Sequence, residues 1–402
     1  MNPNPAATQV AVAQIGARRH YAIPRILHDV GRLAGLYTDF CAEAWPWPGG
    51  ALGGSRWAGV PRKLAHAFPL FALKRALRAR RARTPAQRLR AYTAWNREFG
   101  RLVAAAGLGQ ARAVYAFNAA ALEIFEYARA HALVTLLDQT AAPWEVDETL
   151  LAEERQRWPG WEFDGTAPGD WGPLAERERQ EWALADRIIC GSDYVREALD
   201  SVSGPAEKCR VIPYGLEENQ FTPRVKERGP GPLRVLFVGA IQLRKGVQYL
   251  VDAARSLRPG AAELRLVGPV RVSGKAANEL RSVAEILPPV PRTSLQAVYD
   301  AADVLVLPTL SEGSANVCYE ALACGLPVVT TPNAGSVVRD GVEGFIVPIR
   351  SPQDIADRLG RLAGDRELLV SMSAQAAVRS REFTRAQYAQ RLLAAFSDIL
   401  PS

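Results

Sequence analysis

Two adjacent cations, Arg244 and Lys245, lie in a turn whose type and position suit a phosphate group. The turn GAIQLRKG follows the apolar run LRVLFV (residues 233–238) and opens a predicted helix over 246–257. Free amide groups and the positive dipole end at a helix start attract a phosphate, and two cations suit a diphosphate. Taken alone, the turn is equally consistent with an ordinary strand–loop–helix connection whose cations are solvated.

Two carboxylates, Glu312 and Glu320, stand eight residues apart in the run SEGSANVCYE, which follows another apolar run at 303–307. Eight residues are a little over two helical turns, so both carboxylates could face one cleft. Beside a phosphate site they suit sugar hydroxyls as hydrogen-bond acceptors better than they suit phosphate. Ser314 or Asn316 is the expected cap of the helix. A loop carboxylate and an unrelated helix-surface glutamate are the alternative.

The elements that must position these groups alternate between strand and helix in two series. Continuous apolar strands alternating with helices indicate parallel sheets covered on both faces. The first series covers residues 9–212, the second covers 233–348, and the Pro/Gly-rich stretch 221–232 is the expected linker. The fold class is therefore α/β, with two doubly wound domains whose ligands lie at the carboxyl ends of the strands, in the cleft between them.

Several of these segments resemble the motifs of one family. The run EGSANVCYEALACGLPVVTTPNAG resembles the E-x7-E signature of retaining glycosyltransferases of family 4, which have the GT-B fold of two facing Rossmann-like domains. GVEGFIVP, FVGAIQLRKG, VIPYGLEENQF and GSDYVREAL match further family segments. The resemblance is strong over residues 187–350 and weak in the N-terminal half. It implies an acceptor-binding domain over 1–222, a nucleotide-sugar-binding domain over 223–383, and a last helix, about 384–402, that packs back on the first domain.

The family's functional residues can be carried over by motif. The resemblance implies that Lys245 binds the donor diphosphate, Glu320 accepts the ribose hydroxyls and Glu312 accepts hydroxyls of the donor sugar. The donor-binding residues it implies are Gly16, Gly239, Arg244, Lys245, Glu312, Gly313, Ser314, Ala315, Asn316, Val317 and Glu320. It further implies no bound metal and no cofactor apart from the nucleotide sugar as co-substrate, because cations and a helix dipole stabilise the leaving group.

Three departures from the family pattern leave positions open. Ala240 stands where the family usually has arginine, so Arg244 is expected to take that role. Where many members have a histidine after the fourth strand of the first domain, this chain has LLDQT, and Asp138 or Gln139 is expected at the reacting centre. A strand-end aspartate that caps the next turn is the alternative. The predicted catalytic residues are thus Glu312, Lys245, Arg244 and Asp138.

The third departure is the loop after the first strand, where the family often has a Gly-Gly pair. Here the sequence is Gly16 followed by ARRHY. Gly16 keeps a close backbone approach, and the following polar residues reach the cleft. The predicted acceptor-binding residues are Arg18, Arg19, His20 and Gln139, with a solvated loop histidine as the alternative for His20.

The net charge of +7 on 402 residues comes from one segment. Residues 44–97 contain twelve basic and no acidic residues, which leaves 37 basic against 42 acidic residues elsewhere. With Trp45, Trp47 and Trp57 beside it, the basic stretch 56–97 fits contact with the inner membrane surface. An ordinary pair of Arg-rich helices is the alternative. No nucleic-acid-binding motif accompanies the charge, so nucleic acid is excluded as a partner.

The remaining composition favours a cytoplasmic protein. The five cysteines are scattered, without a CxxC pair, which argues against a disulfide framework or a zinc site. The first residues lack the pattern of a secretory signal, and no apolar run reaches membrane length.

The sequence therefore predicts a retaining glycosyltransferase of cell-envelope polysaccharide or glycolipid synthesis. It would move a hexose from a nucleotide-diphosphate sugar, with UDP favoured, to a hydroxyl of a glycan or lipid-linked acceptor. The alternatives are a GDP-mannose-dependent mannosyltransferase and a non-catalytic relative that binds nucleotide sugars or glycans.

Overall fold

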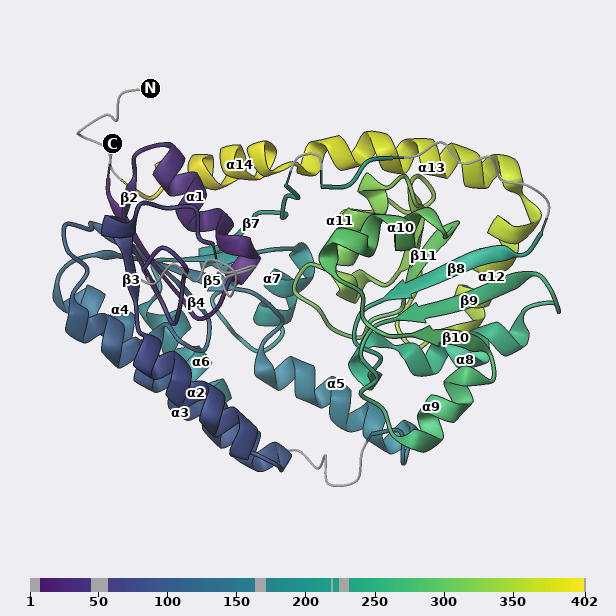
Figure 1. Ribbon diagram of the computed structural model, residues 1–402, viewed down its shortest axis with the longest axis horizontal. Helices are drawn as coiled ribbons and strands as arrows, with labels where there is room; N and C mark the ends of the chain where they lie inside the picture. Colours follow the sequence, from purple (N-terminus) through teal and green to yellow (C-terminus); the bar gives the residue numbers. More distant parts are fainter. Residues whose placement is uncertain (1–7, 45–56, 163–170, 218–219, 224–230, 401–402) are drawn as a thin grey trace.

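Two parallel β-sheets lie side by side in the structure, each with helices on its faces (Figure 1). The computed structural model describes residues 8–44, 57–162, 171–217, 220–223 and 231–400. We call the part built on the first sheet the N-terminal unit and the part built on the second sheet the C-terminal unit. Most of the expected linker 221–232 lies outside the described residues, as do Trp45, Trp47 and Arg56.

The sheet of the N-terminal unit has seven strands in the order β3-β2-β1-β4-β5-β6-β7. These strands are β1 (Val10–Gln14), β2 (Leu33–Thr38), β3 (Ala65–Ala67), β4 (Ala113–Phe117), β5 (Val134–Gln139), β6 (Arg187–Cys190) and β7 (Cys209–Val211). The sheet of the C-terminal unit has six strands in the order β10-β9-β8-β11-β12-β13. They are β8 (Leu233–Val238), β9 (Ala262–Val267), β10 (Ala284–Leu287), β11 (Val304–Leu307), β12 (Val328–Thr330) and β13 (Gly344–Ile346).

The helices connect successive strands and then close the chain. In the N-terminal unit they are α1 (Ala22–Asp29), α2 (Pro69–Arg81), α3 (Pro85–Ala106), α4 (Leu122–Ala130), α5 (Trp144–Arg157), α6 (Gly172–Leu184) and α7 (Asp193–Asp200). The C-terminal unit has α8 (Val247–Ser256), α9 (Gly274–Arg281), α10 (Leu295–Asp300), α11 (Asn316–Ala323), α12 (Pro352–Gly364) and α13 (Arg366–Ser380). The last helix is α14 (Arg385–Ser397).

The central strands are buried because helices cover both faces of each sheet. Every residue of β1, β4 and β11 is buried, and neighbouring strands of both sheets run parallel in the described part of the chain. This arrangement confirms the predicted α/β class with two doubly wound sheets. Strand order β2-β1-β4 and β9-β8-β11 places a crossover beside the first strand of each sheet, which opens a crevice at its carboxyl end.

Two edge strands were not predicted. β3 has the sequence AHA and β10 the sequence AEIL, both too short and too exposed to give a pattern. The basic segment forms two helices, as α2 ends before a new start at Thr84. The Thr84 hydroxyl accepts from the amide of Gln87, and the Gln87 side chain accepts from the amide of Thr84, which makes a capping box. None of the helices in the described part of the chain is long and apolar enough to cross a membrane.

Helices α5 and α14 pass from one unit to the other (Figure 1). Tyr388, Leu392 and Phe396 of α14 share a core cluster with Tyr115 of β4. The buried Glu154 near the end of α5 accepts hydrogen bonds from Gln248 and Tyr249 of α8 and from Arg350, while Trp161 lies in the core of the C-terminal unit. The two units therefore share a continuous set of side-chain contacts as well as covalent connections.

Candidate functional site

The turn after β8 is shaped by a glycine that no other residue could replace without movement. Gly246 has φ 72°, and a Cβ atom on it would lie 1.8 Å from the carbonyl oxygen of Pro308. The turn residues Leu243–Lys245 form a short 3-10 helix directly before it. Its backbone also accepts from the next loop, because the amide of Leu310 donates to the carbonyl of Arg244 at 2.9 Å. The turns after β8 and β11 are thus packed directly against each other.

This packing brings together two residues that the sequence predicts as partners in one site. The Lys245 amine and the Glu312 carboxylate form an ion pair, although 67 residues separate them. Arg244 lies beside them, and its guanidinium donates to the carbonyl of Ser311 at 3.2 Å. Burial lowers the pKa of Lys245, and the charge of Arg244 lowers it further, while the Glu312 carboxylate favours the charged amine. The cation Lys245 and the carboxylate of Glu312, which can accept hydrogen bonds from hydroxyls, therefore lie together at the carboxyl end of the sheet of the C-terminal unit.

Helix α11 starts beside this pair without a side-chain cap. Its N-cap is Ala315, and no side chain accepts from its first amides. The expected cap by Ser314 or Asn316 is therefore wrong, because the Ser314 hydroxyl instead bonds to Tyr319 and to the carbonyl of Gly335. An uncapped helix start keeps its amides and positive dipole end available for an anion. Val317 follows in the first turn and is half-buried.

Glu320 is held one turn along α11 by two side chains that sequence reasoning missed. Tyr299 of α10 donates to its Oε2 atom at 2.7 Å, and Arg292 lies 3.6 Å from its Oε1 atom. Burial raises the pKa of Glu320, and the Tyr299 hydrogen bond and the Arg292 charge oppose that rise. Tyr299 and Arg292 lie in a stretch without a recognisable motif, so only the fold reveals them.

Gly16 follows β1 at the carboxyl end of the sheet of the N-terminal unit. It has φ 76°, and its amide donates to Oδ1 of Asp39 at 2.8 Å. A Cβ atom on Gly16 would meet no atom within 4 Å among the described residues. Gly239 at the end of β8 also has positive φ, 146°, but a Cβ there would pack on Phe237. The backbone at Gly16 is therefore open to a close approach.

Asp138 does not reach an accessible surface. Its carboxylate is fully buried and accepts from Arg19 at 2.7 Å and from the Tyr115 hydroxyl at 2.5 Å. Arg19 also donates to the Tyr388 hydroxyl and stacks over the Tyr214 ring, with its carbon 3.7 Å from the ring centre. Burial raises the pKa of Asp138, and the Arg19 charge opposes that rise. Asp138 is therefore held inside the N-terminal unit, whereas Arg19, although paired with Asp138, also lines a pocket together with His20 and Asn316.

Gln139 is also occupied within the N-terminal unit. Its amide nitrogen donates to Glu178 and to the carbonyl of Ala141, and its oxygen accepts from the indole of Trp182. Both polar atoms of the Gln139 side chain therefore have partners inside the protein, and neither is available for the expected contact with an acceptor. The structure contradicts the expectation that Asp138 or Gln139 faces the reacting centre, because both side chains are buried and their polar atoms form internal hydrogen bonds.

His20 and Asn316 line one pocket between the two units. Arg292, Gln220 and Tyr388 line it as well, so both units and α14 contribute to it. His20 keeps part of its surface exposed, and the partial burial of its ring lowers its pKa, as do the nearby charges of Arg292 and Arg25. This pocket joins a predicted acceptor residue to a predicted donor residue. Arg18 is half-buried, and its guanidinium lies 5.9 Å from the centre of the Phe117 ring.

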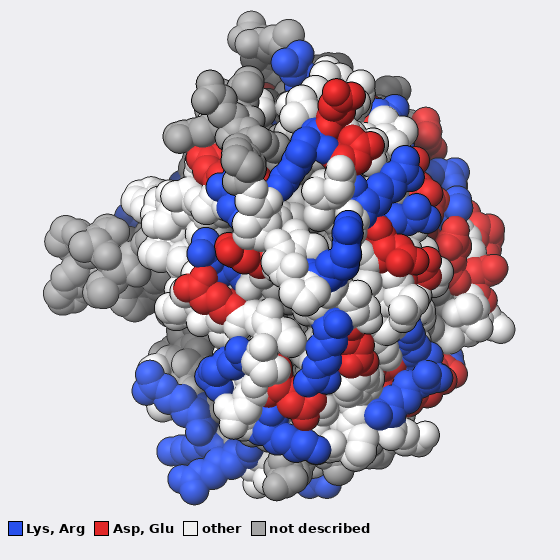
Figure 2. Space-filling view, turned by 90° about the vertical axis from the view of Figure 1, so that its right-hand side faces the viewer, with Lys and Arg blue, Asp and Glu red and all other residues white. Residues whose placement is uncertain are grey.

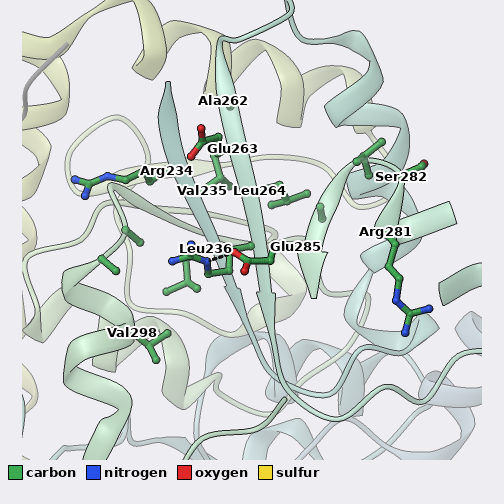
Figure 3. Close-up of a pocket in the computed structure, with 15 residues that line it drawn as sticks. Arg234, Val235, Leu236, Ala262, Glu263, Leu264, Arg281, Ser282, Glu285 and Val298 are labelled. Atoms are coloured by element: carbon green, nitrogen blue, oxygen red, sulfur yellow. Dashed lines mark hydrogen bonds and ion pairs between the residues drawn. The ribbon is translucent and has the colours of Figure 1, made fainter. Parts of the chain in front are cut away.

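A larger pocket lies on the opposite edge of the second sheet (Figure 3). Arg234, Ala262 and Ala284 line it, and these residues lie at the starts of β8, β9 and β10. Lys245 and Glu312 follow the other ends of the strands, so this pocket does not belong to the candidate site. The outer face of the C-terminal unit carries interspersed cations and anions (Figure 2), including the ion pair Arg265–Glu285 on β9 and β10.

No group of three or more His, Cys, Asp or Glu side chains in the described part of the chain is placed to hold a metal ion. The five cysteines are buried, and they are not joined by disulfide bonds.

The C-terminal unit is similar to known glycosyl transferases. Residues 232–365 match the family model of group 1 glycosyl transferases. The D-inositol 3-phosphate glycosyltransferase of Nocardia farcinica is 34% identical over 247 residues, which cover 56% of this chain and 55% of that protein. The enzyme of the same name from Corynebacterium jeikeium is 32% identical over 254 residues, 56% of this chain and 60% of that protein. The chain spans a little over half the length of these curated relatives.

Solved structures match almost the whole chain. The crystal structure of HepE from Anabaena in complex with UDP and glucose has a TM-score of 0.65 at 15% identity, and the match covers 98% of this chain and 100% of HepE. Sucrose-phosphate synthase from Thermosynechococcus elongatus has a TM-score of 0.63 at 18% identity, covering 98% and 99% of the two chains. At these identities the likeness concerns the fold. The chain therefore has the GT-B fold, and its residues 232–365 are similar to the group 1 glycosyl transferases.

Proposed function

We propose that this chain is a retaining, metal-independent glycosyltransferase that moves a hexose from a nucleotide-diphosphate sugar to a hydroxyl group. The observation that carries the proposal is the Lys245–Glu312 pair beside the uncapped start of α11. It supplies a cation, free helix amides and a hydroxyl acceptor within one small region. In this proposal the domain over 223–383 binds the donor and the domain over 1–222 binds the acceptor.

The proposed chemistry follows from the charges at this region. When the bond between the sugar and the diphosphate breaks, negative charge develops on the phosphate. Lys245, Arg244 and the positive end of α11 are placed to stabilise that charge without a metal ion. Glu312 would accept hydrogen bonds from the donor sugar once the diphosphate draws Lys245 away from it. Glu320, fixed by Tyr299, would accept the ribose hydroxyls.

UDP is the proposed nucleotide. Support comes from the similar structures of Anabaena HepE, which were solved with UDP, with UDP-glucose, and with UDP and glucose. Binding would need no resident cofactor, because the nucleotide sugar is itself a substrate. The curated relatives are named for D-inositol 3-phosphate, so this compound belongs among the acceptors tested first.

A lipid-linked acceptor at the inner membrane face is proposed on the basis of α2. Leu70, Leu73 and Leu77 are 74%, 59% and 43% exposed, and their spacing places them on one face of the helix. Arg80 and Arg81 are exposed at the end of the same helix. Exposed leucines with nearby cations fit the boundary of an anionic membrane, to which the protein would bind peripherally from the cytoplasm.

Nucleotide release tests the activity. The protein is incubated with UDP, GDP and ADP sugars, with and without an acceptor, and the free nucleotide diphosphate is measured. We expect release from a UDP sugar, a loss of about 100-fold in Lys245→Ala and Glu312→Gln, and no change in the control Lys275→Ala on the exposed face of α9. Binding of no nucleotide sugar would contradict the proposal, and release that requires an added divalent ion would contradict its metal independence.

Vesicle binding tests the membrane contact separately. Vesicles with and without anionic lipid are sedimented with the protein and with the variant Leu70→Ser/Leu73→Ser. The matched control is Val370→Ser on α13, whose side chain is 53% exposed. We expect binding to anionic vesicles only, reduced several-fold in the α2 variant and unchanged in the control. Equal sedimentation of all three proteins would assign α2 to the ordinary surface of the N-terminal unit.

A further inference from the structure

Side chains of the N-terminal unit form hydrogen bonds with the loop that carries Glu312. Ser311, directly before Glu312, is 1% exposed. Its hydroxyl donates to Oδ1 of Asp147 in the first turn of α5 and accepts from the Tyr194 hydroxyl of α7 at 2.9 Å. Asp147 and Tyr194 belong to the N-terminal unit, so two of its helices converge on one buried hydroxyl of the C-terminal unit.

The residue after Glu312 is held in the same way. A Cβ atom on Gly313 would lie 1.7 Å from the carbonyl oxygen of Thr140, so the two backbones are in direct contact there. The Ser192 hydroxyl donates to the carbonyl of Gly313 at 2.5 Å. Both neighbours of Glu312 are therefore fixed by the N-terminal unit, while the Glu312 side chain itself points to Lys245.

Asp147 also acts on the charges of the site. Its Oδ2 atom lies 3.9 Å from the guanidinium of Arg244, which donates to the carbonyl of Ser311. Its side chain is 16% exposed. Burial raises the pKa of Asp147, and Arg244 and the Ser311 hydroxyl oppose that rise. One carboxylate thus contacts the hydroxyl before Glu312 and faces the cation before Lys245.

We propose that Asp147 and Tyr194 are positioning residues: through Ser311 they orient Glu312 toward the donor sugar, so that sugar recognition in the C-terminal unit depends on contact with the N-terminal unit. This inference rests on the proposed function. The nucleotide diphosphate itself would meet Lys245, Arg244, Glu320 and the start of α11, and of these Asp147 faces only Arg244, at 3.9 Å. Because Arg244 keeps its charge and its hydrogen bond to the carbonyl of Ser311 without Asp147, we expect the affinity for the diphosphate to change much less than the recognition of the sugar.

The test compares affinity for UDP with affinity for the intact UDP sugar that the wild-type protein turns over. Calorimetry gives both dissociation constants, and nucleotide release gives kcat and KM. In Asp147→Ala we expect kcat to fall about tenfold, while the dissociation constant of UDP stays within about twofold of wild type. Any extra affinity contributed by the sugar should be lost. Asp147→Asn keeps an acceptor for the Ser311 hydroxyl, so its kcat should stay within about threefold of wild type.

Glu145 offers a matched control on the same turn of α5. Its carboxylate is 49% exposed and pairs with Arg179, so Glu145→Ala removes an equal charge at the same helix start without touching the loop. We expect wild-type kcat and affinities in that variant. Combining Asp147→Ala with Ser311→Ala should cost no more than either change alone, because both break the same contact.

Several outcomes would overturn the inference. An equal loss of affinity for UDP and the UDP sugar would mean general damage to the site, and unchanged kcat in Asp147→Ala would mean that the contact is only packing. If Asp147→Ala does not fold, Tyr194→Phe serves instead, with an expected two- to threefold loss of kcat at constant UDP affinity. A wild-type protein that binds no nucleotide sugar would overturn the proposed function itself, whereas normal wild-type turnover with an unaffected variant overturns the inference alone.

Discussion

The turns after β1 and after β8 begin alike and end differently. Each follows a buried strand, contains a glycine with positive φ and carries two adjacent cations, Arg18 and Arg19 in one and Arg244 and Lys245 in the other. After β8 the lysine meets Glu312 at the edge of the site. After β1, Arg19 turns back into its own unit and pairs with the buried Asp138. The two turns are similar in sequence, but the position of the nearest carboxylate decides whether the cation lies at the edge of the site or inside its own unit.

The backbones of the two turns are also stabilised differently. Gly246 adopts φ 72° without steric cost, because glycine has no Cβ atom. In the turn after β1, three successive residues, Arg19, His20 and Tyr21, have φ of 47°, 51° and 60°. Such residues each cost on the order of 1 kcal/mol and persist only where surrounding contacts fix them. The contacts of Arg19 with Asp138, Tyr388 and Tyr214 provide that restraint.

Removing the carboxylate of Asp138 should have the largest effect and would show what the N-terminal turn depends on. Asp138→Ala leaves Arg19 in a largely buried position without its ion-pair partner, so we expect a loss of about 3–5 kcal/mol in the free energy of unfolding. Urea denaturation measures it. The control Arg18→Ala, on the neighbouring half-buried cation, should cost less than about 1 kcal/mol.

The same variant separates a structural from a catalytic Asp138. If Asp138 acts only by holding Arg19, adding Arg19→Met should recover part of the lost stability, because the unpaired charge is gone. Stability equal to wild type in Asp138→Ala, combined with lost nucleotide release, would restore the catalytic assignment made from the sequence.

The polar network behind β5 should make stability depend on pH. Glu178 accepts from Gln139 and from the amide of Trp144, and burial raises its pKa to about 7. A carboxyl whose pKa is raised by folding stabilises the protein fully below its unfolded value near 4.5, and that contribution is lost as the pH rises through 7. The shift corresponds to about 3 kcal/mol. Urea titrations at pH 4.5 and pH 8 measure it.

The variant Glu178→Gln removes this contribution and leaves Glu181, whose pKa is raised to about 8 by burial. The charge of Glu178 also raises the pKa of Glu181, so the difference between the two proteins measures Glu178 together with its effect on Glu181. The variant should gain on wild type as the pH rises. A constant difference in stability between pH 4.5 and pH 8 would show that Glu178 does not titrate in this range. Titration of a buried carboxyl would then no longer distinguish the N-terminal unit from the C-terminal site.

The sequence predicted the covered strands and the meeting of Lys245 with Glu312, but not the contacts of Arg19 and Asp138. Strand β8 matches its predicted bounds, residues 233–238, because buried parallel strands are continuous apolar runs. The pairing of Lys245 with Glu312 follows from turns at adjacent strand ends. The pairing of Arg19 with Asp138, and the convergence of Asp147 on Ser311, join segments 119 and 164 residues apart with no motif to mark them. Such contacts are set by helix placement, which local patterns do not contain.

The variant Gly246→Ala tests whether the turn after β8 depends on its close contact with Pro308 or only on the positive φ of the glycine. Gly246→Ala places a Cβ atom 1.8 Å from the carbonyl of Pro308, so the turns carrying Lys245 and Glu312 must move apart. We expect a loss of about 2 kcal/mol in stability and about tenfold in affinity for UDP. Gly260→Ala is the control, since Gly260 has φ 75° but a Cβ there meets no described atom within 4 Å. Equal losses in both would mean that the turn contact is unimportant.

The variant Gly16→Ala should have the smallest effect on stability. It tests whether a substrate lies against the backbone of the turn after β1 during turnover, as proposed for the turn after β8. Gly16 and Gly260 have almost the same φ, 76° and 75°, and within the described ranges neither Cβ would meet a neighbour. Both substitutions should therefore cost about 1 kcal/mol in stability. If a substrate approaches the backbone of Gly16, only Gly16→Ala should also raise KM for the UDP sugar, by about tenfold. An unchanged KM would mean that the turn after β1 serves the fold alone and that donor binding is confined to the turns after β8 and β11.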